Sequence, residues 1–136
     1  MERLIADTGF FVALGRSSDP CHAGARAFIE RFKGQLVTTS PIVVETCHFL
    51  TSRSRCDLLE WIHDAGPSVA EVPVDAFPDL CVTIRKFANR DIDFADASLV
   101  WLAEQTGLRK ILTVDTADFS LFRLKGGKRF QLVDWA

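Results

Sequence analysis

Four acidic residues lie where an apolar strand is expected to end or a helix to begin. Asp7 and Asp115 each follow directly on a short apolar run. Glu45 lies one turn into an expected helix, and Asp96 lies in the first turn of another, after Asp93. In an open parallel sheet the strand ends and helix starts meet at one edge, where such folds bind ligands. We therefore expect these four carboxylates to lie close together.

Carboxylates gathered at one edge repel one another. Two unit charges ~4 Å apart at an effective dielectric near 20 interact with about 4 kcal/mol. Such a cluster must hold a cation, hold protons or spread apart. A bound metal ion can activate a water molecule and neutralise charge on a phosphate group without any Ser–His–Asp set. The pattern thus predicts metal-dependent phosphodiester chemistry.

The elements that must position these acids alternate along the chain. Strands are expected at 3–6, 36–38, 69–72, 110–114 and 129–133. Helices are expected at 10–14, 20–33, 41–53, 55–65, 77–87 and 94–106, with caps at Asp19, Ser40, Ser54 (with Asp57), Asp75 and Asp93. Strands interleaved with helices predict an α/β/α sandwich around a five-stranded, mostly parallel sheet, as one domain over 1–136.

Composition limits the class of protein. The 136 residues are enough for one domain with its own core. We find no apolar segment long enough to span a membrane and no secretion signal, so we expect a cytoplasmic protein. The net charge is −2, but the basic residues are in small excess once the four candidate acids are set aside. That balance permits an RNA partner without requiring one.

The four cysteines do not form a metal-binding pattern. Cys21-His22 and Cys47-His48 are adjacent pairs, whereas structural zinc sites space their ligands two to four residues apart. We expect the cysteines to be small apolar residues or free thiols.

Four motifs carry a family resemblance. They are D-T-G at 7–9, V-V-E-T around Glu45, D-x-x-D-A at 93–97 and T-V-D-T-A-D-F at 113–119. In order and spacing they resemble the motif series of the PIN domain, and most closely the small single-domain ribonucleases of the VapC type, which are toxins of toxin–antitoxin pairs. The resemblance covers essentially the whole chain.

The resemblance implies a fold, a chemistry and partners. It implies a sheet of strand order 3-2-1-4-5, which would place Asp7 beside Asp115, with Glu45 and Asp96 arriving from flanking helices. By resemblance these four are the catalytic, metal-binding residues, holding one or two Mg²⁺ (or Mn²⁺) ions and hydrolysing RNA to leave a 5′-phosphate. It also implies an antitoxin whose tail delivers an Arg or Lys to the carboxylates, and a homodimer.

Four further residues could support the site. Thr8 and Thr113 have hydroxyls that could orient carboxylates or metal-bound water, although Thr113 could instead be a strand threonine bonded to backbone. Asp93 could be only a helix cap with Asp96 as its partner, or could contact the metal directly or through water. Asp118 could likewise assist the metal or cap a short turn at 119–122.

Three surface features are open at this stage. Gly9 stands where many PIN relatives carry Ser or Asn, which removes one side-chain contact. A basic group in a Gly-Gly turn could hold RNA or an acidic antitoxin tail, or could simply be solvated: Arg123, Lys125, Lys128 and Arg129. The helices at 41–53 and 55–65 could form the dimer contact through Phe49 and Trp61.

Other readings compete with a nuclease. A haloacid-dehalogenase-type phosphatase needs D-x-D, and the second acid is replaced by Gly9; a response-regulator receiver needs a Lys that the last strand lacks. The stronger alternative is a non-catalytic RNA- or protein-binding module on the same fold. Four intact, mutually repelling acids argue against it.

Overall fold

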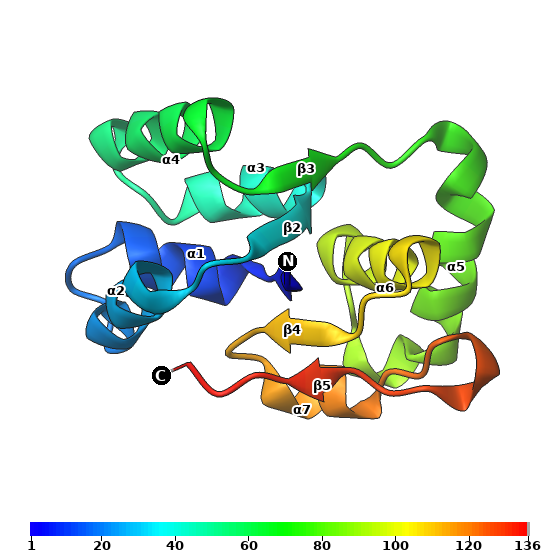
Figure 1. The fold of residues 1–136 in the computed structure, drawn as a ribbon. Coiled ribbons are helices and arrows are strands. Elements are labelled where there is room, and N and C mark those ends of the chain that lie inside the picture. Colours follow the sequence, from blue (N-terminus) through cyan, green and yellow to red (C-terminus); the bar gives the residue numbers. More distant parts are fainter. Residues whose placement is uncertain (136) are drawn as a thin grey trace.

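A parallel sheet forms the centre of the computed structural model, which describes residues 1–135 (Figure 1). Its strands are β1 (Arg3–Ala6), β2 (Gln35–Thr39), β3 (Ser68–Ala70), β4 (Lys110–Leu112) and β5 (Gln131–Leu132). The order is β3-β2-β1-β4-β5, and all four neighbouring pairs are parallel. The predicted fold class and strand order are confirmed.

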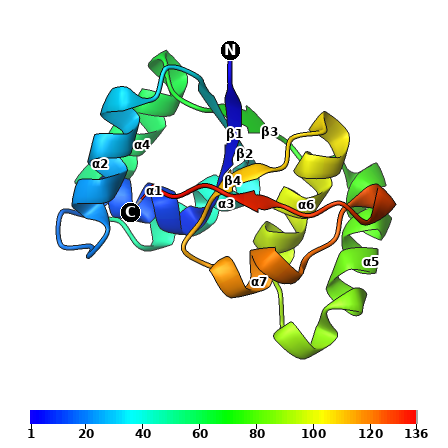
Figure 2. The same cartoon turned by 60° about the horizontal axis from the view of Figure 1, so that its bottom comes forward.

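Helices cover both sides of the sheet. They are α1 (Thr8–Gly15), α2 (His22–Arg31), α3 (Ser40–His48), α4 (Ser52–Asp64), α5 (Phe77–Lys86), α6 (Phe94–Thr106) and α7 (Thr116–Leu121). Short 3-10 turns occur at Val74–Ala76, Ala88–Arg90 and Lys125–Gly127. Figure 2 shows α1, α2 and α4 on one side of the sheet and α5 and α6 on the other. Within residues 1–135, none of the helices has the length and apolar character needed to cross a bilayer.

The central strands are apolar because both of their faces are covered. Leu4, Ile5 and Ala6 of β1 are at most 2% exposed. A strand buried on both faces has no polar alternation, which is typical of parallel sheets. Beside it, the ring of Phe10 packs edge-on against Phe28, with ring centroids 5.9 Å apart. This packing holds α1, which follows directly on β1, against α2.

Two predicted helix starts on the α1–α3 side are wrong. α2 begins at His22, and Asp19 instead accepts a hydrogen bond from the Cys21 amide at 2.8 Å, which shapes the turn before the helix. α3 has Thr39 at its N-cap, so Ser40 lies inside the helix. The Ser40 hydroxyl donates to Glu71 at 2.7 Å, so it is used between elements and not as a cap.

Two more predicted caps are wrong. α4 is capped by Thr51, whose hydroxyl accepts from the Ser54 amide at 3.2 Å, so the proposed pairing of Ser54 with Asp57 is not the cap. Thr51 and Ser54 are both good caps three residues apart, and sequence alone does not choose between them. Asp75 lies in a 3-10 turn, and α5 starts without a side-chain cap.

The cap of α6 is confirmed. Asp93 accepts from the Asp96 amide at 2.9 Å, and Asp96 accepts in return from the Asp93 amide at 3.3 Å, which together form a capping box. Gly107 ends the helix with a left-handed φ of 76°. α7 was not predicted: it begins after Asp115, which accepts from the Asp118 amide at 3.2 Å. The alternative in which Asp118 caps a short turn at 119–122 is therefore wrong, because Asp115 is the cap, and a role of Asp118 beside the metal stays a prediction.

Candidate active site at the carboxyl edge of the sheet

The two strand-end acids lie at the ends of neighbouring strands. Asp7 continues the pairing of β1 with β4, since its amide donates to the Leu112 carbonyl at 3.0 Å. Asp115 follows β4 after two more residues. The strand order runs in opposite directions from β1, with β2 and β3 on one side and β4 and β5 on the other. Asp7, at the end of β1, therefore lies at the switch point of the fold.

The carboxylate of Asp7 is held on both oxygens. Its Oδ1 accepts from the Thr8 amide at 2.7 Å, and its Oδ2 accepts from the Thr113 hydroxyl at 2.8 Å. The Thr113 hydroxyl also accepts from the Asp115 amide at 2.9 Å. Asp7 is 5% exposed. Thr113 therefore joins the ends of β1 and β4, and both alternatives considered for it hold: it orients a carboxylate and is bonded to backbone.

Thr8 joins the first acid to the second. Its hydroxyl donates to Glu45 Oε1 at 2.5 Å, while its amide donates to Asp7. Glu45 is partly exposed on α3, one turn into the helix as expected. The Thr38 hydroxyl donates to the Ala6 carbonyl at 2.8 Å, which fixes β2 beside the residue that precedes Asp7.

Asp93 and Asp96, at the N-terminus of α6, add two more carboxylates to the group around Asp7. The charge of Asp93 acts on the carboxyl groups of Asp7, Glu45 and Asp96. Asp93 is therefore both the cap of α6 and a neighbour of three of the four predicted site acids. The sequence left a helix cap and a metal contact open as alternatives; the capping box confirms the first, and the metal contact stays a prediction.

Asp115 and Asp118 form the far side of the group with one basic residue. The Arg90 Nε lies 2.6 Å from Asp118 Oδ1, and the charge of Arg90 also acts on Asp115. Sequence reasoning missed Arg90. A single arginine in a short 3-10 turn has no periodicity or motif that distinguishes it from an ordinary exposed charge.

The pKa values of all four predicted site acids are raised. Burial raises the pKa of Asp7 to about 6, against the Thr113 and Thr8 hydrogen bonds, which lower it. Burial and the charge of Asp93 raise the pKa of Asp96 to about 8. Burial is also the first cause of the raised pKa values of Glu45 and Asp115. Each of these groups is therefore destabilised as an anion in the protein without a cation.

The acids form an electrostatic cluster and not a closed cage. Among residues 1–135, no three side chains of the Asp, Glu, His or Cys types are close enough together to enclose one ion. Repulsion between carboxylates favours such spreading. The donors are nevertheless all oxygens, which are the ligands that Mg²⁺ prefers. This donor set is of the kind that a divalent cation of the hard class takes, and a bound cation would offset the burial and repulsion that raise these pKa values.

Gly9 is crowded by the residue before Asp115. A Cβ added at Gly9 would overlap the side chain of Val114, which lies between Thr113 and Asp115. The space of a larger side chain at position 9 is therefore occupied by valine. The glycine at position 9, where the PIN motif often has a larger residue, therefore leaves room for the Val114 side chain of the fourth motif.

The other open features are accounted for in different ways. Arg123 donates to the last carbonyls of α7, from Ser120, Leu121 and Phe122, at 2.8–3.1 Å, and so serves the helix end. Lys125, Lys128 and Arg129 are exposed around the Gly-Gly turn. Trp61 packs against Phe11 with ring centroids 6.4 Å apart, so its ring is used inside the chain, whereas Phe49 is 53% exposed. All four cysteines are free.

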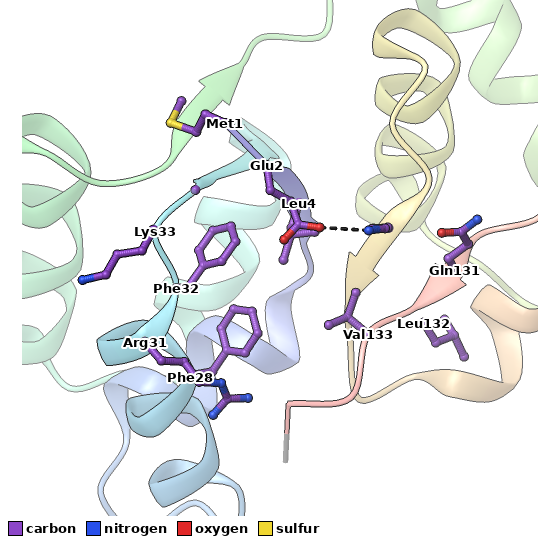
Figure 3. Close-up of a pocket in the computed structure, with 12 residues that line it drawn as sticks. Met1, Glu2, Leu4, Phe28, Arg31, Phe32, Lys33, Gln131, Leu132 and Val133 are labelled. Carbon is purple, nitrogen blue, oxygen red and sulfur yellow. Dashed lines mark hydrogen bonds and ion pairs between the residues drawn. The ribbon is translucent and has the colours of Figure 1, made fainter.

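A larger hollow, of about 760 Å³, lies at the opposite edge of the sheet, where the strands begin (Figure 3). Its apolar walls include Leu4, Phe28 and Phe32. The one acid lining it, Glu2, is paired with Lys110 at 2.9 Å. It lacks grouped carboxylates and is not a candidate for the same chemistry.

Comparison with known proteins agrees with this fold. In sequence, the chain is similar to Ribonuclease VapC26 of Mycobacterium tuberculosis, with 27% identity over 134 residues that cover 96% of this chain and 99% of the relative. In structure, it is similar to the crystal structure of VapC20 of Mycobacterium tuberculosis, which is described as a Sarcin-Ricin loop cleaving toxin. That match has a TM-score of 0.75 and 19% identity, and covers 85% of this chain and 93% of the other.

The strand order and the acids at the switch point define a class of α/β/α proteins with a carboxylate cluster at the carboxyl edge of a 3-2-1-4-5 sheet. The model of the PIN domain matches residues 4–123 of the chain, from the first strand through the fourth motif. The chain belongs to the PIN domain family, and the resemblance seen in the motifs is confirmed.

Proposed function

We propose that this chain is a Mg²⁺- or Mn²⁺-dependent endoribonuclease of the VapC type, acting as a single PIN-like domain over 1–136 and serving as the toxin of a toxin–antitoxin pair. The observation that carries the proposal is the chain of contacts from Glu45 through Thr8, Asp7 and Thr113 to Asp115. The names of the similar ribonuclease and toxin support the same substrate class.

Asp7, Glu45, Asp96 and Asp115 would hold the metal. Such an ion, when bound, lowers the pKa of a water and neutralises charge on the scissile phosphate. Thr8 and Thr113 hold Asp7 with both oxygens occupied by donors, so its orientation is set before any substrate arrives. The Thr8 hydroxyl holds one oxygen of Glu45 in place.

Asp93 and Asp118 would support these residues from outside. Asp93 adds negative charge beside three of the acids, which strengthens attraction for a cation. Asp118 holds Arg90 at the rim of the cluster. The guanidinium would face the phosphates of an RNA that reaches the carboxylates, and would partly offset their repulsion.

The test is cleavage of single-stranded RNA by the purified chain in Mg²⁺ or Mn²⁺ and in EDTA. We expect cleavage to require the metal and to leave 5′-phosphate ends. Glu45→Gln should abolish it, while Glu60→Gln, on the exposed side of α4, should not. Binding of RNA without cleavage in any metal would support the non-catalytic module instead. Cleavage unchanged in EDTA and in Glu45→Gln would indicate a contaminating nuclease.

The partners follow from the same proposal. An antitoxin tail that places an Arg or Lys against the acids would neutralise them in place of the metal. A homodimer could form through the exposed apolar residues of α3 and its end, such as Phe49, which is 53% exposed. Co-expression with the upstream gene product and measurement of the mass in solution test these two points.

A further inference from the structure

A hollow of about 450 Å³ lies beside the carboxylates, between the starts of α3 and α6. We propose that it is a nucleobase subsite, which receives the base next to the phosphodiester held at the acids. This inference rests on the proposed function and names how the same site would hold single-stranded RNA. The volume is within the range of small-molecule sites.

The hollow is continuous with the acid cluster. Glu45 and Asp93 both line it, and both belong to the electrostatic group around Asp7. An occupant therefore contacts the cluster directly. The base of a nucleotide whose phosphate lies at the acids meets that condition, because base and phosphate are joined through one sugar.

The lining selects the uncharged part of a nucleotide. Pro41, Val44 and Phe94 supply apolar surface, and no Lys or Arg is among the residues that line the hollow in the described chain. Val44 is 60% exposed and Phe94 is 41% exposed. A phosphate inside the hollow would meet two acids and no Lys or Arg, whereas a base is planar and neutral.

Phe94 is held in place for stacking. It is the first residue of α6, directly after the capping residue Asp93, so its backbone position is set by the capping box. Its ring packs against Phe77 with centroids 5.6 Å apart and an interplanar angle of 86°. Sequence-selective recognition of RNA relies on unstacked bases resting on such aromatic side chains.

His48 is an exposed residue that lines the hollow. Its exposed imidazole can donate to and accept from the edge of a base. His48 also lines a second, more polar hollow of about 710 Å³ that contains Arg16, Ser17 and Thr51. The cation and hydroxyls there suit a sugar-phosphate backbone, so the RNA would continue from the base subsite past His48 toward Arg16.

The experiment measures binding separately from cleavage. The Asp7→Asn protein, in Mg²⁺, is titrated with fluorescent ten-nucleotide homopolymers of A, C, G and U and with an abasic sugar-phosphate of equal length. We expect at least one homopolymer to bind about 5- to 150-fold more tightly than the abasic chain, which is the range for stacking of one base. Adding Phe94→Leu should remove that preference, and Phe94→Trp should keep or increase it.

Val82→Ala is the matched control, since Val82 is an exposed apolar side chain of α5 at 62% exposure and should leave the preference unchanged. A preference that survives Phe94→Leu would overturn the subsite. The subsite would also be overturned if the Phe94→Leu protein had half the mass in solution of the protein with Phe94. That result would mean that a second copy of the chain covers the Phe94 ring. Cleavage by the wild-type protein is scored separately, so loss of the subsite and loss of the proposed ribonuclease activity give different results.

Discussion

At the scale of single residues, the two threonines explain how a buried acid can stay in place without a basic partner. Asp7 receives one hydrogen bond from Thr8 and one from Thr113, and both lower its pKa. Burial outweighs them, and the pKa of Asp7 is raised to about 6. The carboxylate is thus well oriented and energetically unfavourable, which is a state that a cation would relieve.

Replacing Asp7 by Asn should stabilise the metal-free protein. A pKa raised from 3.8 to about 6 corresponds to about 3 kcal/mol of penalty above pH 6. The amide nitrogen cannot accept a hydrogen bond from its donor, which costs about 1–2 kcal/mol. We expect a net gain of about 1–2 kcal/mol in the free energy of unfolding in EDTA at pH 8, measured by denaturant titration. A lower stability of Asp7→Asn under these conditions would contradict the clustering of charge.

Removing the Thr113 hydroxyl should have the opposite effect. Thr113→Val keeps the shape of the side chain but leaves Asp7 Oδ2 and the Asp115 amide without their partner. The pKa of Asp7 should rise further, and the protein should lose about 1–3 kcal/mol at pH 8. The NMR titration of the Asp7 carboxyl carbon measures this shift. Ser120→Ala is the control. The Ser120 hydroxyl donates to the Thr116 carbonyl of its own helix, so its removal should leave the Asp7 titration unchanged.

At the scale of elements, α6 shows one residue serving helix and site together. Asp93 caps the helix and adds charge beside Asp7, Glu45 and Asp96. A helix start is a natural place for acids, because its free amides and dipole favour negative charge. The same preference that begins the helix therefore concentrates carboxylates at the sheet edge.

Two substitutions at Asp93 separate these roles. Asparagine is as good a cap as aspartate, so Asp93→Asn should keep α6 and relieve repulsion, giving equal or higher stability in EDTA. Asp93→Ala removes the cap as well and should be about 1 kcal/mol less stable than Asp93→Asn. Thermal unfolding of both variants without metal tests the order. Equal stability of the two would show that the capping box contributes nothing.

Elements that begin and end at clear capping or helix-ending residues could be predicted from the sequence, and elements whose bounds depend on tertiary contacts could not. Asp93 and Gly107 bound α6 as predicted, and β1 was predicted at its observed residues. α7 was missed because its six residues have no helical periodicity, and its cap, Asp115, read only as a strand end. Thr51 and Ser54 were equivalent in sequence, and the structure shows that Thr51 accepts from the Ser54 amide.

The same limit applies to the candidate site. Four acids at strand ends and helix starts followed from the pattern of apolar runs. The Thr8–Glu45 contact did not, because it joins residues 37 positions apart. Arg90 reaches Asp118 across 28 positions from a short 3-10 turn that carries no motif. Long-range side-chain contacts depend on how helices pack on the sheet, which no local signal contains.

At the scale of the whole molecule, the four raised pKa values act in one direction. A group with a higher pKa in the folded chain binds more protons there than in the unfolded chain, so stability falls as the pH rises between the two values. For Asp7 the window runs from 3.8 to about 6, and for Asp96 from 3.8 to about 8. The shifts of Glu45 and Asp115 have the same sign.

The metal-free protein should therefore become less stable from pH 5 to pH 8, by a few kcal/mol. Denaturant titrations in EDTA at pH 5, 6.5 and 8 measure the trend, and Mg²⁺ at pH 8 should restore part of the loss. In the Asp7→Asn variant the slope between pH 5 and 6.5 should be smaller. A stability that rises across this range would show that the acids are not mutually destabilised.

The close approach of Gly9 to Val114 couples the side chains that positions 9 and 114 can carry, and so couples the first motif to the fourth. Serine at position 9 alone would overlap the side chain of Val114, which would have to move away. Serine at 9 together with alanine at 114 removes most of that overlap. We expect Gly9→Ser to be tolerated better together with Val114→Ala than alone, so the first motif of another PIN domain is best grafted together with its fourth motif.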